Sequence, residues 1–482
     1  MYRLSLEMIG VIELMINGRR QSTAKISIIG VGSASFGINI LGSLFRSKKL
    51  KRCEIELVDI NKNNLSRMTQ LAHLLNNKME ANITITSTPD LNSGLFGAEF
   101  VISAIEVPPR ETLWRQDFEI SLKYGVRQPY AENGGPGGFI HAARNIGPVL
   151  DIVHHMEKVC PDALFINFSN PMVRICDAVN RFSNIKVVGL CHQINAAYGM
   201  VGYLLSEEFN IEVPDGPFST HADPKYWGNL KQIAGQAKEK IDIKAAGLNH
   251  FTWILGIYDK SSGKDLYPTI RDAWDKSEAG FEPLTHEVYD IFGLMPVPGD
   301  EHLDEYLPWC SDPITKPWEK YDLSLYDWDG AAHRRNDSVL NIEKVIRGEE
   351  KLESILNVDS EGAIEVIESI AFNTGDYHEA VNTPNNGQIS NLPDGVIVET
   401  PAYINGSGIQ PINIGELPVG IVELLKREIS VGQLCVDAAV TGNRSLALQC
   451  LLLDPVITDL DVAKLILDDY LETYKGLLPD FR

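Results

Sequence analysis

The chain has 482 residues, 44% of them hydrophobic, which is enough for a large core and two or more domains. Its 43 basic and 65 acidic residues give a formal net charge of −22, which argues against nucleic acid and anionic membrane surfaces as partners. The seven scattered cysteines do not resemble a disulfide framework, and no apolar window is long enough to cross a membrane. We therefore expect a cytoplasmic protein.

Residues 1–24 precede the first strong structural pattern. Glu7 and Glu13 interrupt their apolar stretch, and no small-residue cleavage site follows it. We interpret this segment as an N-terminal extension rather than a signal peptide.

From residue 25, short β-branched runs alternate with segments whose apolar residues have helical spacing. We predict strands at 25–32, 53–60, 81–90, 98–105, 163–171 and 185–192, and helices at 36–47, 63–79, 111–124 and 141–159. This alternation predicts an α/β fold with a parallel, doubly wound Rossmann-type sheet.

After about residue 195 the segments become longer, richer in aromatic residues and mostly helical. Strand-like patterns occur at 243–249, 394–400 and 402–412. We therefore predict a first domain at 25–195 and a C-terminal α+β domain at 196–482. No stretch between them is typical of a flexible linker, so we expect the two to pack tightly.

A glycine-rich turn follows the first predicted strand. The sequence GVGSASFG (30–37) has Gly30 and Gly32 at the first two glycine positions of a dinucleotide-binding motif, with Ser35 at the third. A carboxylate at the end of the second predicted strand, Asp59, is suited to ribose hydroxyls and favours NAD over NADP. The cofactor-binding residues that we predict are Gly30, Gly32, Ser33, Phe36 and Asp59. An ordinary glycine turn of an α/β protein is the alternative.

Two apolar strands end on residues that can bind a metal. VVGLCHQINAAYG (187–199) places Cys191 and His192 together, and IKAAGLNHFTWIL (243–255) ends on Asn249 and His250. Taken singly, a buried cysteine is usually a packing residue, and a histidine a hydrogen-bonded core residue. Both lie where open α/β sheets bind ligands, however, and thiolate and imidazole suit a borderline divalent ion.

Other motifs have both a functional and a structural interpretation. Asn170 precedes a proline in NFSNP and either binds substrate or forms a turn. Arg110 and Arg115, which lie on different faces of a predicted helix, are either clamps for substrate or surface residues. The segment AENGGPGGF (131–139) is a glycine-rich loop that could close over the cofactor. Arg174 is a third arginine that could act as such a clamp.

LMPVPGDEHLDEYLPW (294–309) is rich in carboxylates. Asp300, Glu301, Asp304 and Glu305 are either part of a site or the solvated first turn of a helix, where acids favour the dipole. We expect the solvated turn for all but Asp300.

Taken together, these motifs resemble glycoside hydrolase family 4, the NAD- and divalent-metal-dependent glycosidases. The resemblance extends over nearly all residues from Lys25 onward and rests on ISIIGVGSASFG, RQDFEISLKYG, GGPGGF, NFSNPM, GLCHQ, AGLNHFTW, GLMPVPGD and NNGQISNLPDGVIVETP. It implies a lactate/malate-dehydrogenase-like fold and Cys191 and His250 as ligands of a catalytic metal, commonly manganese. We assign substrate contacts to Asn170, Arg110 and Asn249.

The resemblance also implies a reaction that differs from two-carboxylate glycoside hydrolysis. NAD oxidises C3 of the sugar, a base removes the proton at C2, the glycosidic oxygen leaves, water adds, and the hydride returns. Asp300 follows a proline-glycine turn and matches the base of α-glucosidase-like members. His192, directly after the metal-binding cysteine, matches the position of the acid.

The residue pair Cys191–His192 resembles members that act on unphosphorylated glucosides, galactosides or uronides, and related proteins are homodimers or homotetramers. Two other functions remain open. One is an NAD-dependent 2-hydroxy acid dehydrogenase of the same fold, which would produce net NADH. The other is a redox sensor that binds NAD without turning over any sugar.

Overall fold

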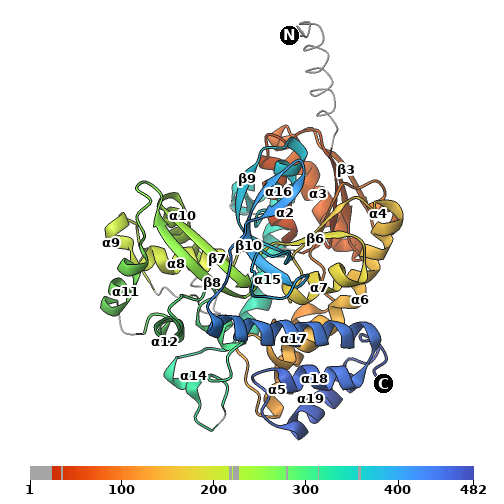
Figure 1. The fold of residues 1–482 in the computed structure, drawn as a ribbon. Coiled ribbons are helices and arrows are strands. Elements are labelled where there is room, and N and C mark those ends of the chain that lie inside the picture. The colour runs from red at the N-terminus through yellow and green to blue at the C-terminus, as the bar shows by residue number, and fades with distance from the viewer. Residues whose placement is uncertain are drawn as a thin grey trace, which may run out of the picture.

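The computed structural model describes residues 24–33, 36–216, 220, 227–277, 280–312, 314–356 and 360–482. Within these residues, helices flank an 11-stranded sheet (Figure 1). The strands are β1 (Lys25–Ile29), β2 (Glu54–Val58), β3 (Thr84–Thr88), β4 (Phe100–Ser103), β5 (Leu164–Asn167), β6 (Lys186–Gly189), β7 (Ile241–Leu248), β8 (Phe251–Asp259), β9 (Asp376–Pro384), β10 (Ile397–Asn405) and β11 (Gly408–Pro411).

The helices of the N-terminal half are α2 (Phe36–Arg46), α3 (Lys62–Met79), α4 (Leu91–Leu95), α5 (Arg110–Lys123), α6 (Gly135–Val159), α7 (Met172–Phe182), α8 (Ile194–Leu204), α9 (Ser206–Phe209) and α10 (Trp227–Lys240). Those that follow are α11 (Tyr267–Lys276), α12 (Pro283–Phe292), α13 (Asp300–Asp304), α14 (Pro317–Lys320), α15 (Trp328–Ile346), the 3-10 helix η3 (Leu352–Ile355), α16 (Ala363–Phe372), α17 (Val419–Thr441), α18 (Arg444–Leu453) and α19 (Leu460–Thr473).

The first six strands form a parallel sheet in the order β3-β2-β1-β4-β5-β6. This is the strand order of the doubly wound dinucleotide-binding fold. The predicted Rossmann-type fold with a C-terminal domain is thus confirmed, and every strand and helix predicted before residue 192 is present. The sequence patterns did not predict α4, α7, β8 or β9.

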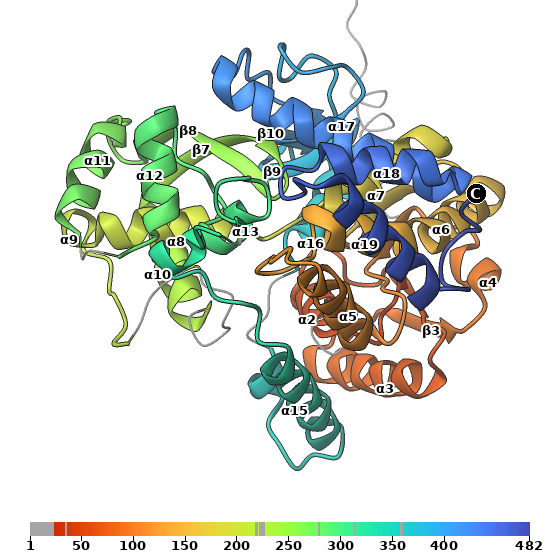
Figure 2. The ribbon, with the colours of Figure 1, turned by 90° about the horizontal axis from the view of Figure 1, so that it is seen from below.

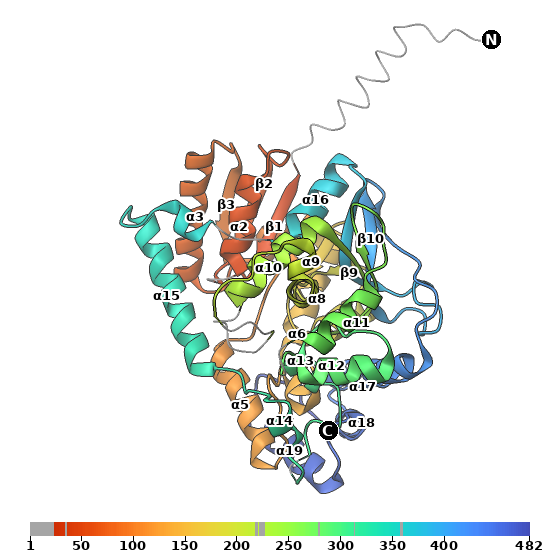
Figure 3. The same cartoon turned by 90° about the vertical axis from the view of Figure 1, so that its left-hand side faces the viewer.

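Both faces of this sheet are covered, which explains its continuous apolar strands. Alternate residues of β1 enter different cores: Ile28 packs with α2, α3 and α16, and Ile29 packs with α4, α6 and α7. Figure 3 shows α2 and α3 beside β1, β2 and β3. In such folds ligands bind at the carboxyl ends of the strands.

Only residues 131–134 of the glycine-rich segment 131–139 form a loop, so the loop that we predicted is wrong for residues 135–139. Helix α6 begins at Gly135, and the surrounding glycines are buried. A Cβ atom on Gly137 would lie 2.5 Å from the Cβ of Ala131, and one on Gly138 would lie 2.3 Å from the carbonyl oxygen of Asn133. The glycines therefore allow close packing of the helix start rather than flexibility.

The sheet continues into the C-terminal half. Gly189 of β6 pairs with Asn382 of the antiparallel β9, and the order then runs through β10 and β7 to β8. The β7–β8 hairpin carries α8, α10, α11 and α12, which form a lobe with its own core at one side of the molecule (Figures 1 and 2). The C-terminal helices α17 and α18 pack back on α6.

The division at 195/196 therefore separates two halves of one sheet, and this domain boundary stays a prediction. All seven cysteines are free thiols. None of the helices in the described residues has the length and apolar character that are needed to span a membrane.

Candidate functional site

Cys191 and His250 meet at the carboxyl end of the sheet. Cys191 follows β6, and His250 lies in the turn of the β7–β8 hairpin, 59 residues further along the chain. In the sheet, β9 and β10 separate these strands, yet Sγ of Cys191 and Nε2 of His250 are 3.1 Å apart. The turn of the hairpin brings His250 over the end of β6.

The surroundings of this pair contain buried polar atoms without partners. Among the described residues, Nδ1 of His250, Oδ1 of Asn249 and Oδ1 of Asn170 make no hydrogen bond. The other end of the Asn249 amide is fixed, because its Nδ2 donates to Glu399 Oε2 at 2.9 Å. Asn170 follows β5, the strand next to β6. Buried polar atoms are almost always satisfied, so a ligand or water is expected at this place.

Burial sets the protonation of both residues. Burial raises the pKa of the Cys191 thiol, Glu361 and Glu399 add to this, and hydrogen bonds from Asn249 and Gln193 oppose it. Burial lowers the pKa of His250 well below its usual value, and the neighbouring His302 and His192 act in the same direction. The imidazole is therefore neutral and the thiol protonated until a cation displaces the thiol proton.

A divalent ion fits this pair. Metal–sulfur and metal–nitrogen bonds of about 2.3 and 2.1 Å allow one ion to contact two atoms that are 3.1 Å apart. Among the described residues, no group of three or more His, Cys, Asp or Glu side chains could hold a metal. Two protein ligands leave the remaining positions to substrate oxygens or water, as a catalytic metal requires.

A stack of rings covers His250, and none of the sequence patterns above predicts it. The ring of His302 lies 4.7 Å from that of His250, and on its other side the ring of Tyr130 lies 4.1 Å away with an interplanar angle of 6°. Nδ1 of His302 lies 3.3 Å from Oε2 of Glu305. The spacing of His302 and Glu305, three residues apart on one helical turn, was the available signal.

The acidic stretch after Gly299 is buried, so our expectation of a solvated helical turn is wrong. Glu301, Asp304 and Glu305 are each at most 2% exposed. Burial raises the pKa of Asp304 to about 8, although Arg127 opposes this. The apolar neighbours of α13 in the sheet's C-terminal half, which local periodicity does not reveal, account for the difference.

Asp300, the predicted base, caps helix α12. Its carboxylate accepts hydrogen bonds from the backbone N–H groups of Leu284 and Thr285 and from the Thr285 hydroxyl. Burial and the nearby carboxylate of Glu282 raise its pKa well above the usual value. In the part of the chain that is described, no hydrogen bond joins Asp300 to Cys191 or His250. Asp300 and His302 do share helix α13, two residues apart.

His192, the predicted acid, directly follows Cys191 in the chain. Its side chain is 62% exposed, and Nδ1 lies 3.0 Å from Oε1 of Glu361. Arg110 starts α5 and lies between two carboxylates, 3.7 Å from Glu106 and 3.3 Å from Glu132. The backbone N–H of Glu132 donates to Glu305, so Arg110 connects to the ring stack.

The glycine turn fits a dinucleotide. Gly30 has a φ of +77°, which favours glycine, and a Cβ on Gly32 would lie 2.5 Å from Oδ2 of Asp59. The N–H of Gly32 donates to this carboxylate at 2.8 Å. Ser33 accepts a hydrogen bond from the N–H of Phe36, the first residue of α2. Ser35 lies outside the described residues.

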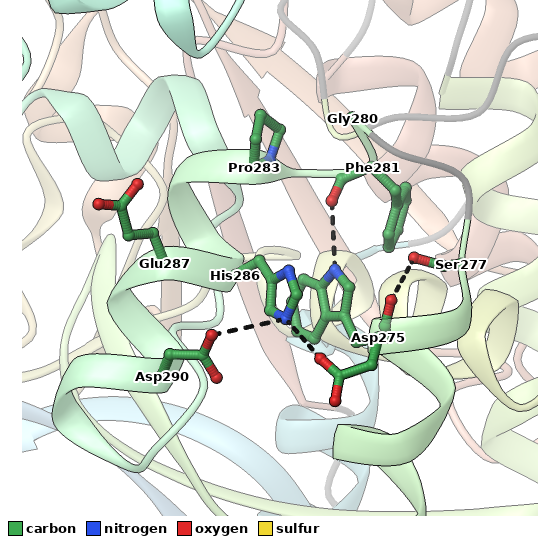
Figure 4. Close-up of a pocket in the computed structure, with 9 residues that line it drawn as sticks. Asp275, Ser277, Gly280, Phe281, Pro283, His286, Glu287 and Asp290 are labelled. Atoms are coloured by element: carbon green, nitrogen blue, oxygen red, sulfur yellow. Dashed lines mark hydrogen bonds and ion pairs between the residues drawn. The ribbon is translucent and has the colours of Figure 1, made fainter.

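A separate surface pocket of about 450 Å³ lies between α11 and α12 (Figure 4). The imidazole of His286 lies flat on the indole of Trp274, with ring centroids 4.8 Å apart. Asp275 and Asp290 flank its Nε2 at 3.7 and 3.9 Å. The residues that line this pocket include none of the predicted site residues, so it is distinct from the Cys191–His250 pair.

The fold and site together define a nucleotide-binding α/β enzyme. Its thiol–imidazole pair lies where the sheet changes from parallel to antiparallel strands. Residues 25–206 match the family 4 glycosyl hydrolase model, and residues 245–457 match the model of the family 4 glycosyl hydrolase C-terminal domain. The chain belongs to family 4 of the glycosyl hydrolases, and it is a glycosidase.

Its relatives have several specificities. An alpha-glucosidase of Erwinia rhapontici is 34% identical over 445 residues, which cover 90% of this chain and 94% of the relative. An alpha-galactosidase of Bacillus subtilis is 28% identical and covers 95% of this chain and 100% of its own. A 6-phospho-beta glucosidase of Thermotoga maritima, solved with manganese, NAD+ and glucose-6-phosphate, has a TM-score of 0.75 at 22% identity, over 94% of this chain and 99% of that one.

Proposed function

We propose that the protein hydrolyses unphosphorylated α-glycosides, with α-glucosides as the first candidates, and uses NAD and a divalent metal such as manganese. The observation that carries this proposal is the Cys191–His250 pair, 3.1 Å apart among unpartnered buried amide oxygens. The similarity to an alpha-glucosidase over 90% of the chain supports the choice of sugar.

Each group of residues has a proposed task. Gly30, Gly32, Ser33, Phe36 and Asp59 hold the dinucleotide, and Cys191 with His250 holds the metal. Bound there, NAD supplies a reversible hydride acceptor and the metal a Lewis acid.

The remaining groups act on the sugar. Asn170 and Asn249 bind its hydroxyls through their free amide oxygens. Asp300 removes the proton at C2, for which a raised pKa suits a base near neutral pH, and His192 protonates the leaving oxygen.

The ion pairs of Arg110 and Arg115 favour an uncharged sugar as substrate. A phosphate or uronate needs an available cation, yet Arg110 lies between Glu106 and Glu132. Arg115 pairs with carboxylates at the surface, and Arg174 is buried near Asp454 and Glu428. The charges of Arg110 and Arg115 are thus already balanced, whereas Nη1 of the buried Arg174 has no hydrogen-bond partner among the described residues.

The test is hydrolysis of nitrophenyl α- and β-glucosides, galactosides and uronides under reducing conditions, with NAD and Mn²⁺ and with each omitted in turn. We expect release from an α-glycoside that requires both and produces no net NADH. Release without NAD would contradict the proposal, and NADH that accumulates with substrate loss would indicate the dehydrogenase alternative. A cytoplasmic homodimer or homotetramer remains our prediction for its location and assembly.

A further inference from the structure

The ring stack over His250 has a polar edge that the proposed reaction does not use. His302 lies between Tyr130 and His250, so its plane is fixed from both sides. Glu305 holds its Nδ1 at 3.3 Å. The other oxygen of Glu305 accepts hydrogen bonds from the N–H groups of Glu132 and Asn133, at 3.0 and 3.2 Å. The position of Glu305 is therefore set by the backbone rather than by His302.

This arrangement leaves one atom of the ring for a ligand. A carboxylate at one imidazole nitrogen orients the ring and presents the other nitrogen, as in other carboxylate–histidine pairs. Within the described residues, Nε2 of His302 has no hydrogen-bond partner. The side chain remains 20% exposed, although Glu305 below it is fully buried. Part of the His302 ring is therefore open to solvent next to the ring of His250.

We infer that His302 is a substrate-binding residue, whose Nε2 bonds a hydroxyl of the sugar held at the Cys191–His250 pair. The inference rests on the proposed function, since it places the sugar beside His250. Two fixed ring faces and one fixed nitrogen make the position of Nε2 precise, which is what discrimination between sugars that differ at one hydroxyl requires.

The test is calorimetric binding of free sugars to the protein loaded with Mn²⁺ and NAD. Glucose, galactose and glucuronic acid are titrated first, and then the four monodeoxy analogues of the sugar that binds best. The variant is H302F, which keeps an aromatic ring in the stack and removes both nitrogens. The matched control is H286F, because His286 also stacks flat on an aromatic ring but lies in the separate pocket of Figure 4.

We expect H302F to bind the parent sugar about tenfold more weakly, the cost of one hydrogen bond. For one deoxy analogue, the one that lacks the hydroxyl bound by His302, H302F and wild type should have the same affinity. H286F should bind every sugar normally, and H302F should keep the affinity of wild type for Mn²⁺. If H302F weakens the binding of all analogues equally, or of none, the inference about His302 is overturned and the proposed function is not. A wild-type protein that binds Mn²⁺ and NAD but no sugar would overturn the proposed function as well.

Discussion

At Gly32 the absence of a side chain allows the Asp59 carboxylate to contact the glycine turn. The Gly32 N–H donates to the carboxylate at 2.8 Å, and a methyl side chain would lie 2.5 Å from it and 2.6 Å from Cβ of Asn64. Such contacts are too short, so either the turn or the start of α3 must move.

The first prediction concerns this contact. G32A should lower the affinity for NADH at least about tenfold, because overpacking costs about 1–3 kcal/mol and displaces the carboxylate. Fluorescence titration of NADH measures it. G147A is the control, since a Cβ at Gly147 meets nothing within 4 Å. Normal NADH binding by G32A would show that the turn does not hold the cofactor.

The second prediction concerns the metal. C191S replaces the thiol by a hydroxyl that does not ionise near neutral pH, so Mn²⁺ affinity should fall by more than the roughly 10–100-fold typical of changes around the ligands. Titration followed by electron paramagnetic resonance measures free Mn²⁺. C160S changes a buried cysteine at the end of α6 and should bind Mn²⁺ with the affinity of wild type. Equal affinities of C191S and C160S would exclude Cys191 as a ligand.

Between elements, buried charges join α5, α6 and α19. Arg144 donates to both oxygens of Asp117 at 2.6 and 2.5 Å, and both side chains are at most 3% exposed. The ring of Tyr474 from the C-terminal segment lies 4.6 Å from the guanidinium, and the hydroxyl of Tyr470 donates to the Asp117 carbonyl. The last helix is thus attached to the first half of the chain.

R144M should reduce the free energy of unfolding by about 3–5 kcal/mol, because it leaves the Asp117 carboxylate buried without its partner. Urea denaturation measures it. R115M is the control, on the neighbouring helix α5: Arg115 forms exposed pairs, whose loss costs at most about 1 kcal/mol. The double variant D117L/R144M should recover part of the loss. Equal effects of R144M and R115M would contradict the argument.

A second link joins the end of β4 to α6. Nε2 of His141 lies 2.9 Å from Oε2 of Glu106. Burial alone would raise the pKa of Glu106, but the charge and hydrogen bond of His141 lower it to about 2. Burial alone would lower the pKa of His141, but Glu106 raises it above 6.5. Each partner thus stabilises the charged form of the other.

The pH dependence follows from these directions. The raised pKa of His141 stabilises the fold below the unfolded value of 6.5, and this contribution disappears as pH rises through the folded pKa. The lowered pKa of Glu106 contributes above 4.5 and disappears as pH falls toward about 2. The difference in unfolding free energy between wild type and H141Q should therefore be larger at about pH 6 than at about pH 9.

Urea denaturation at several pH values measures this difference. H154Q is the control, since the ring of His154 bonds the carbonyl oxygen of Phe182 rather than a carboxylate. If H141Q lowers the free energy of unfolding by the same amount at both pH values, the protonation of His141 is not coupled to folding.

At the scale of the whole molecule, one sheet and one core cross the predicted domain boundary. β6 pairs with β9, and Val431 and Cys435 of α17 are buried in the same core as residues of α6 and α7. Residues 25–206 alone would expose the edge of β6 and this apolar face, so they lack a closed core.

We predict that a fragment of residues 25–206 does not fold as a stable monomer. Size-exclusion chromatography and near-ultraviolet circular dichroism should show aggregation or loss of fixed packing. Co-expression with residues 207–482 should restore a soluble complex. A fragment that is monomeric, cooperative in unfolding and able to bind NADH would establish the first half as an independent domain.

The sequence alone determined the parallel half of the fold and the candidate ligand pair. Short apolar β-branched runs, helical spacing and the glycine turn are local properties, so strands, helices and the Gly30–Asp59 cofactor turn could be predicted from short windows. The apolar strands that end on Cys191 and His250 could be recognised in the same way, because parallel sheets bind ligands at their carboxyl ends.

Only the tertiary structure decided what surrounds that pair. Tyr130, which completes the ring stack with His302 and His250, lies more than 100 residues before both, and no local pattern relates it to them. The burial of Glu301 and Glu305 likewise depends on the apolar elements packed over α13, and the insertion of β9 and β10 between β6 and β7 is a matter of chain topology. Local periodicity reports which face of an element is apolar, but the neighbour that covers this face is chosen by the whole chain.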